Sequence, residues 1–108
     1  MTRVSIEPRP VEMDDRADVA SNVHARRLDR DLVILDLVNG DYWGLDPIGA
    51  RIWEALVQGM SLREIVSMLR AELAVDEARL TADVLRIAQE LVDRKLLVPR
   101  RPGGTSAP

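Results

Sequence analysis

The period of apolar and polar residues changes near the middle of the chain. Residues 31–38 form a short run of β-branched and long aliphatic side chains, a pattern typical of a β-strand. Asn39-Gly40 follows, and this dipeptide favours a two-residue hairpin because both central residues of a type I′ turn need positive φ. Residues 41–45 then predict the returning strand, and residues 23–28 predict a strand that precedes both. We therefore expect an antiparallel meander of three strands.

A two-residue turn fixes which residues face each other across the hairpin, and here it pairs Leu37 with Tyr42. In that register one face of the sheet carries Leu35, Leu37 and Tyr42, and the other carries Ile34, Trp43 and Leu45. Both faces of the predicted sheet are therefore substantially apolar.

From residue 46 onward the apolar positions recur with the period of a helix, and capping residues mark the starts. Three helices are expected: one from Asp46-Pro47 to Gly59, one from the capping box Ser61 to Glu64 onward, and one from Asp76 or Thr81 to about Lys95. Strands followed by helices, without βαβ alternation, predict an α+β fold in which the three-stranded meander packs on the helices.

Composition divides the chain into three zones. Residues 1–22 hold prolines and an acidic cluster, and we expect them to be partly disordered or to form one short strand at Val4 and Ile6. Residues 23–98 are expected to be the folded domain. Residues 99–108 are rich in Pro and Gly and are expected to be a flexible tail.

The residue inventory argues against catalysis. The 108 residues include no cysteine and one histidine, His24, so thiolate nucleophiles, disulfides and clusters of His or Cys metal ligands are excluded. Neighbouring carboxylates such as Asp14 and Asp15 lie in solvated sequence, where they stay ionised. No segment has the character of a signal peptide or a transmembrane helix. We expect a cytoplasmic protein that is not an enzyme and needs no cofactor or metal ion.

Charge also argues against nucleic acid and membranes as partners. The net charge is −3, from 15 Lys and Arg against 18 Asp and Glu, so long-range attraction to phosphates or anionic lipid is missing. The last two predicted helices have the architecture of a helix-turn-helix pair. Residues 76–95 nevertheless sum to a charge of −1, because four basic residues oppose five acidic ones.

The third predicted helix has more apolar surface than a helix on one side of a core needs, about 100° of its circumference. One interpretation is that the rest of its own domain covers the surplus. The other joins the helix to residues 42–45, the last strand of the meander, whose edge is then unpaired. An open edge beside an apolar helix is suited to β-augmentation by a peptide, and Gly44 is consistent with close approach of a second backbone.

The order of these motifs resembles the PqqD family. The likeness covers roughly residues 23–98 and comprises the glycine hairpin, the strand Tyr42-Trp-Gly-Leu-Asp-Pro, the Trp53 helix, Ser61-Leu-Arg-Glu-Ile-Val and an Asp-Val pair in the last helix. The resemblance implies a winged helix-turn-helix-like domain that binds the leader segment of a ribosomally made precursor peptide. It implies that the leader adds as a strand to residues 41–45 and lies against residues 81–96.

The expected peptide-binding residues combine both lines of reasoning: Asp41, Tyr42, Trp43, Gly44 and Leu45 on the strand, with Arg79, Thr81, Leu85, Arg86, Ala88 and Val92 on the helix. Leu85, Ala88 and Val92 are expected to form apolar pockets, and Arg79 or Arg86 to meet leader carboxylates. The resemblance is strongest to stand-alone members of lasso peptide pathways, where a cysteine protease removes the leader.

Alternatives remain open from the sequence. A PqqD-type chaperone of pyrroloquinoline quinone biosynthesis would serve a radical enzyme, a winged-helix regulator would bind DNA, and an oligomerisation module would use the same strand edge to pair with itself. We expect a monomer or a weak dimer.

Overall fold

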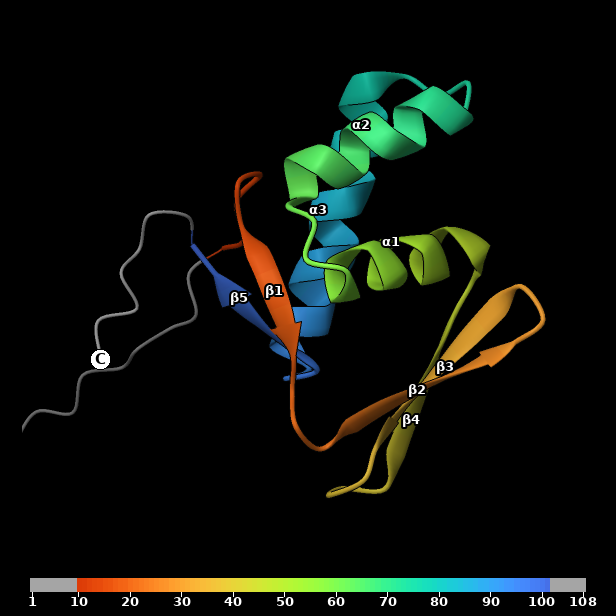
Figure 1. Ribbon diagram of the computed structural model, residues 1–108, viewed down its shortest axis with the longest axis vertical. Coiled ribbons are helices and arrows are strands. Elements are labelled where there is room, and N and C mark those ends of the chain that lie inside the picture. Colours follow the sequence, from red (N-terminus) through yellow and green to blue (C-terminus); the bar gives the residue numbers. More distant parts are fainter. Residues whose placement is uncertain (1–9, 102–108) are drawn as a thin grey trace, which may run out of the picture.

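The computed structural model describes residues 10–101 and confirms the α+β class, with one three-stranded antiparallel sheet and three helices (Figure 1). The elements in chain order are β1 (Arg16–Val19), β2 (Val23–Leu28), β3 (Asp31–Asp36), β4 (Asp41–Leu45), α1 (Pro47–Val57), α2 (Leu62–Glu72), α3 (Glu77–Asp93) and β5 (Leu97–Arg100).

The sheet β2-β3-β4 is the predicted meander, but the register of its second hairpin is two residues from the predicted one. Tyr42 pairs with Leu35 rather than with Leu37, so the loop holds four residues instead of two. Because side chains alternate with a period of two, a shift of two residues leaves every side chain on its predicted face. Ile34 and Trp43 point inward as expected, and Leu35 and Tyr42 point outward.

Asp36 is the reason for the longer loop. Its side chain is only 5% exposed and accepts hydrogen bonds from the backbone N–H groups of Val38 and Asn39 and from the Asn39 side-chain amide. Its backbone oxygen accepts from Gly40 N–H at 2.8 Å. Gly40 alone in the loop has positive φ, at 77°, so the predicted type I′ turn is wrong. The hydrogen bonds that the buried Asp36 carboxylate accepts from the loop stabilise the four-residue loop. They outweigh the preference of Asn-Gly for a two-residue turn.

The three helices begin where the sequence predicts. Asp46 caps α1, Ser61 and Glu64 form the complete capping box of α2, and Asp76 rather than Thr81 caps α3. The third helix ends at Asp93, two residues before the predicted end.

A second sheet, formed by β1 and β5, is absent from the sequence-based prediction. Its two strands pair antiparallel from Arg16 opposite Arg100 to Val19 opposite Leu97. The ordered domain therefore crosses both predicted boundaries, at 22/23 and at 98/99, and Ala17 is part of the buried core. Strands of four residues show too little alternation to be recognised in a sequence. The strand expected at Val4 and Ile6 lies outside the described residues.

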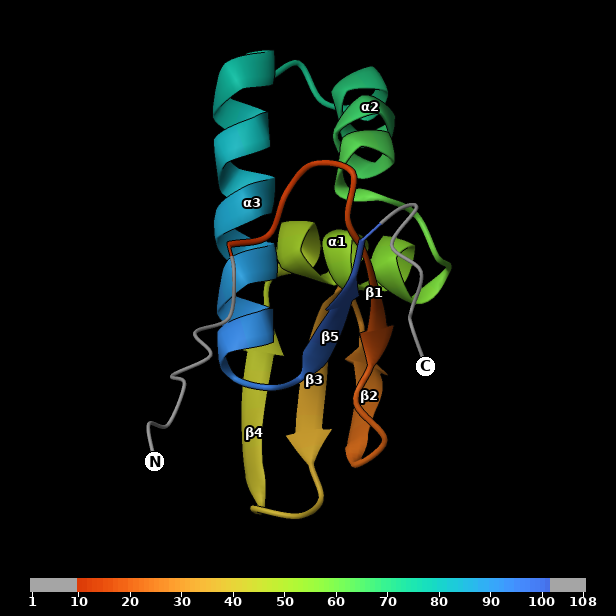
Figure 2. The same cartoon turned by 90° about the vertical axis from the view of Figure 1, so that its left-hand side faces the viewer.

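The core lies among the three helices and where they meet the two sheets. Helix α1 packs against both β1 and the three-stranded sheet, and α3 contacts α2, α1 and β5 (Figures 1 and 2). The largest fully buried side chains are Ile34, Ile52, Leu56, Leu62, Ile65, Leu69, Val84 and Leu96. Trp53 is also buried, as the inner stripe of α1 predicted.

The segment before β1 completes the N-terminus of α2. The first N–H groups of a helix have no partner within it. In α2, Leu62 N–H donates to the carbonyl of Asp15 (3.1 Å) and Arg63 N–H to that of Met13 (2.7 Å). The Ser61 hydroxyl accepts from Glu64 N–H (3.1 Å), so every donor of this helix end is satisfied.

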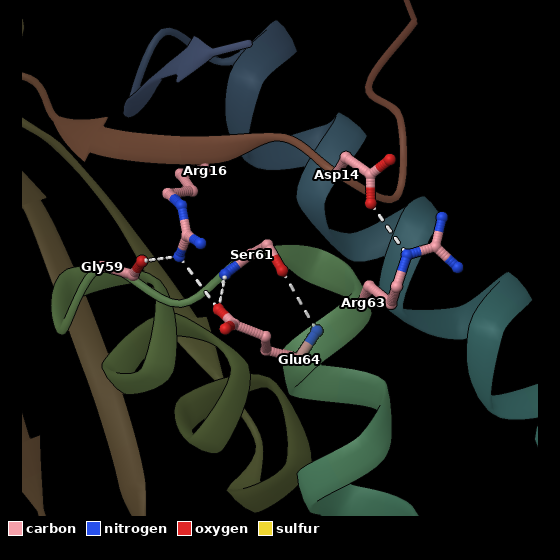
Figure 3. Close-up of polar contacts among 6 residues, drawn as sticks. All are labelled: Asp14, Arg16, Gly59, Ser61, Arg63 and Glu64. Carbon is pink, nitrogen blue, oxygen red and sulfur yellow. Dashed lines mark hydrogen bonds and ion pairs between the residues drawn. The ribbon is translucent and has the colours of Figure 1, made fainter. Parts of the chain in front are cut away.

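Side chains hold the same junction together (Figure 3). The Arg16 guanidinium donates to the Gly59 carbonyl and lies 2.9 Å from a Glu64 carboxylate oxygen, and Asp14 pairs with Arg63 at 2.8 Å. Residues 13–16 are thus bonded to the turn between α1 and α2 and to the start of α2, whereas the sequence grouped them with a separate extension.

Candidate peptide-binding site

Strand β4 is an edge of its sheet. Within the described residues it pairs only with β3, and the order β2-β3-β4 leaves its other side without a strand. Figure 2 shows β4 below the C-terminal half of α3, at the rim of the molecule. The unpaired edge that the sequence predicted is therefore present.

One hydrogen bond, just beyond the end of β3, shows which residues of β3 direct their N–H and C=O groups toward β2 and which toward β4. Leu37 N–H donates to the Asn22 carbonyl at 2.9 Å, which extends the β2–β3 ladder by one pair. Hydrogen-bonded pairs in antiparallel strands occur at every second residue. Odd-numbered residues of β3 therefore bond to β2, and even-numbered ones, such as Ile34, bond to β4.

The open edge of β4 follows from that alternation. Trp43 pairs with Ile34 and directs its N–H and C=O toward β3. Its neighbours Tyr42 and Gly44 direct theirs outward, away from β3. Two donors and two acceptors, spaced for strand pairing, thus lie along residues 42–44.

The two edges of the sheet differ in charge. Edge strands avoid unwanted pairing when they carry charged side chains. Strand β2 has Arg26 and Arg27 along its edge, and Arg27 is held by an ion pair with Glu54. Between Tyr42 and Leu45, β4 carries no charge. The β4 edge is the better acceptor of an additional strand.

Beside the edge, the inner face of β4 is apolar and joins the helices. Trp43 and Leu45 are half-buried against the core, as is Ile48 of α1. The guanidinium of Arg94, the C-cap residue of α3, lies over the Trp43 ring, 5.4 Å from its centroid. Ile87, seven residues earlier on the same side of α3, is also half-buried.

The predicted apolar pockets of α3 lie elsewhere. Ala88 and Val92 line a cavity of about 10 Å³ together with Ala17, Leu97 and Pro99 of the small sheet. Ala88 is only 3% exposed, so the chain itself covers it. In the free chain these two side chains therefore face the small sheet rather than β4.

The remaining predicted residues of α3 are dispersed around it. Thr81 and Leu85 are half-buried and recur with Ala88 and Val92 at helical spacing, on the side away from Trp43. Arg79 and Arg86 are exposed, and Arg86 lies 3.8 Å from Asp83. Strands β1 and β5 and the segment before β1 thus cover much of the surplus apolar surface of α3. That segment is bonded to α3, because Val11 N–H donates to the Gln89 side chain.

The outer face of the sheet has no cover among the described residues. Leu37, Val38 and Tyr42 are 63, 74 and 72% exposed, and Leu35 is half-buried beside them. The solvent face of an antiparallel sheet usually carries polar side chains. Contiguous exposed apolar residues usually mark an interaction surface.

The described residues contain neither a cluster of metal-ligating side chains nor a membrane-spanning helix. No group of three His, Asp or Glu side chains in residues 10–101 could hold a metal ion, and His24 lies exposed on β2. Within the same range, no helix combines the length and the apolar character that crossing a bilayer requires.

Two solved structures share this fold. TbiB1 in complex with the TbiA(beta) leader peptide is 34% identical, with a TM-score of 0.71 over 74% of this chain and 93% of that chain. A lasso peptide synthetase B1 complexed with the leader peptide is 23% identical, with a TM-score of 0.73 over 78% of this chain and 99% of that one. The second likeness shows the fold alone.

Among curated proteins, none matches the sequence significantly. The family model of coenzyme PQQ synthesis protein D (PqqD) matches residues 31–97, from the start of β3 to the start of β5. That span holds the β4 edge, all three helices and the Trp43–Arg94 contact. The chain therefore belongs to the PqqD family.

Proposed function

We propose that this protein is a non-catalytic recognition protein for the leader segment of a ribosomally synthesised precursor peptide. The leader adds as a strand to β4, and its backbone exchanges hydrogen bonds with Tyr42 and Gly44. Trp43, Leu45 and Ile87 provide the apolar surface beside it, and Asp41 lies at the start of the strand. The observation that carries this proposal is the open β4 edge beside α3, which bears no charged side chain from Tyr42 to Leu45.

The similar structure that is 34% identical supports the proposal, because it contains a leader peptide. That structure matches over 74% of this chain, with a TM-score of 0.71. We infer that the natural ligand here belongs to the same class, a precursor of a lasso peptide. The cytoplasm, where such precursors are made, is the expected compartment.

The bound leader is presented to a modifying enzyme, and we propose the cysteine protease that removes it. The exposed outer face around Leu35, Leu37 and Tyr42 supports a protein partner, because it continues directly into the β4 edge. An added leader strand would extend that face, so an enzyme docked there would contact domain and leader together.

Two other functions would use the same fold. The family description names coenzyme PQQ synthesis, in which the partner would be a radical enzyme rather than a protease. The packing of α2 against α3 next to a sheet is also consistent with a winged helix-turn-helix, and a DNA-binding regulator is the remaining alternative. The acidic balance of residues 76–95 argues against that alternative.

The experiment titrates the protein with synthetic peptides that tile the short reading frames neighbouring its gene, with isothermal calorimetry as the readout. The decisive variant is Gly44→Pro. Proline removes an N–H that points outward, so it spares the β3–β4 ladder, and an edge strand tolerates it there. Gly44→Ala is the matched control, because a Cβ at this position meets no atom within 4 Å.

We expect one peptide to bind the wild type and Gly44→Ala equally, and Gly44→Pro at least about tenfold more weakly, since a hydrogen bond and close approach are both lost. Circular dichroism should show all three proteins folded. Equal binding by a folded Gly44→Pro protein would exclude strand addition at β4. Sedimentation at several protein concentrations, without peptide, would show whether the β4 edge instead pairs with a second copy of the chain.

A further inference from the structure

Arg94 occupies an unusual position beside the β4 edge. It is the C-cap residue of α3, and its guanidinium lies over the indole of Trp43, 5.4 Å from the ring centroid. An arginine stacked on an aromatic face keeps its N–H donors in the plane of the guanidinium, where they remain available to hydrogen-bond acceptors. The stack therefore fixes a fork of donors next to the strand edge.

Those donors have no close acceptor in the part of the chain that the structure describes. The nearest carboxylate, that of Glu90, lies 3.9 Å away, which is beyond hydrogen-bonding distance. By contrast, Arg51, Arg63 and Arg70 each lie within 2.9 Å of a carboxylate oxygen. Of the arginines on α3 and its cap, Arg94 is the one that lies over an aromatic ring. Its guanidinium N–H groups have no acceptor within hydrogen-bonding distance among the described residues.

We propose that Arg94 determines specificity at the peptide site by binding a carboxylate of the added strand. This inference rests on the proposed leader binding at β4. The ligand that it selects is a segment with an Asp or Glu side chain at the position that passes Trp43. The planar fork matches a carboxylate in bidentate geometry, which gives both strength and orientation.

The geometry favours a carboxylate over an apolar side chain at this position. The guanidinium lies over the Trp43 ring, so an apolar group that approached the ring from that side would have to displace a charged side chain. A carboxylate instead adds to the stack without breaking it. It also replaces only the long contact with Glu90, an exposed i,i+4 pair of little energetic value.

Sequence reasoning assigned leader carboxylates to Arg79 or Arg86, and the structure favours Arg94. Arg86 lies on the solvent side of α3, opposite the buried Val84, and its only close carboxylate is Asp83 at 3.8 Å. Arg86 therefore resembles Arg94 in charge, exposure and a weak acidic neighbour, and differs in its distance from Trp43. It is the matched control.

The test is a double-mutant cycle measured by calorimetry. Wild type, Arg94→Gln, Arg94→Lys and Arg86→Gln are titrated with the peptide that binds best in the tiling experiment. They are then titrated with versions of that peptide in which each Asp or Glu becomes Asn or Gln. Melting temperatures of the free proteins check that the variants are folded.

We expect Arg94→Gln to weaken binding about tenfold, as loss of a charge-assisted hydrogen bond does, and Arg86→Gln to leave it unchanged. Arg94→Lys should restore part of the loss, since it keeps the charge without the fork. One acidic-to-amide change in the peptide should weaken wild-type binding to the same degree and have no further effect on Arg94→Gln. A purely structural arginine would not show such coupling to one peptide position.

Equal binding by Arg94→Gln and Arg86→Gln overturns the inference, as does a loss that is the same for every peptide. Both results leave leader recognition intact, provided that Gly44→Pro still weakens binding. If no tiled peptide binds the wild type, the proposed function and this inference are both wrong.

Discussion

Removing residues 10–15 should destabilise the domain although they lie outside the part that matches the family. Two chains are compared, one lacking residues 1–9 and one lacking residues 1–15, so that the difference isolates the segment described here. The longer deletion removes the carbonyls of Met13 and Asp15, which accept from Leu62 and Arg63 at the start of α2. It also removes Val11, whose N–H is bonded to α3.

The magnitude follows from those contacts. Three hydrogen bonds at about 0.5–1.5 kcal/mol each, two of them to helix N–H groups that would be left open, give a loss of about 2–4 kcal/mol. For a domain of this size that corresponds to a fall in melting temperature of about 10–20 °C. The half-buried Val11 adds a smaller apolar contribution of the same sign.

Urea titration and thermal melting followed by circular dichroism would measure the difference. Equal stabilities for the two deletions would refute the reasoning that this segment caps α2. Leader binding adds a second readout, measured where both chains are folded. If the leader occupied the Ala88 and Val92 side of α3, uncovering that side would strengthen binding, whereas a site at β4 predicts little change.

Two further predictions concern the hairpin and acid stability. Gly40→Ala should cost about 1–2 kcal/mol in a urea titration because φ at residue 40 is +77°, whereas Gly44→Ala should be neutral or slightly stabilising. Hydrogen bonds, first from the Asn39 side chain, lower the pKa of Asp36, and those from Ser61 N–H and Arg16 lower the pKa of Glu64. As the pH falls, these two carboxylates therefore take up protons at a higher pH in the unfolded chain than in the folded one. The urea midpoint should be constant above about pH 4.5 and decrease as the pH drops through the lowered pKa values. Asp36→Asn should flatten part of that fall, and an unchanged pH profile would contradict it.

The parts of the fold that the sequence predicted are those set by local chemistry. Asp46, Ser61 and Asp76 cap the helices because a side-chain oxygen next to free N–H groups acts within a few residues. The faces of β3 and β4 followed from alternation alone, which is why they survived the error in register. That error has a non-local cause, since Asp36 is buried and is also bonded to the Asn22 amide, fourteen residues away.

The sequence also does not show which element packs against each side of α3, for a similar reason. Periodicity shows that α3 has apolar residues over half its circumference but not which element covers each side. The pairing of β1 with β5 joins residues about eighty positions apart, and no local pattern announces it. Ala88 and Val92 face that pairing, and Arg94, an ordinary basic residue at a helix end, acquires its importance only by lying over Trp43.

The N-terminal segment and the small sheet also narrow where a peptide can bind. They occupy one side of α3, and α1 and α2 pack against others. The side of α3 that faces β4 is the one that ends at Arg94, whose guanidinium lies over Trp43. There the strand edge supplies backbone hydrogen bonds that every extended peptide can make, which gives affinity without selectivity. Discrimination must then come from the side chains next to that edge. Trp43 and Arg94 are the pair positioned to provide it, one by shape and the other by charge.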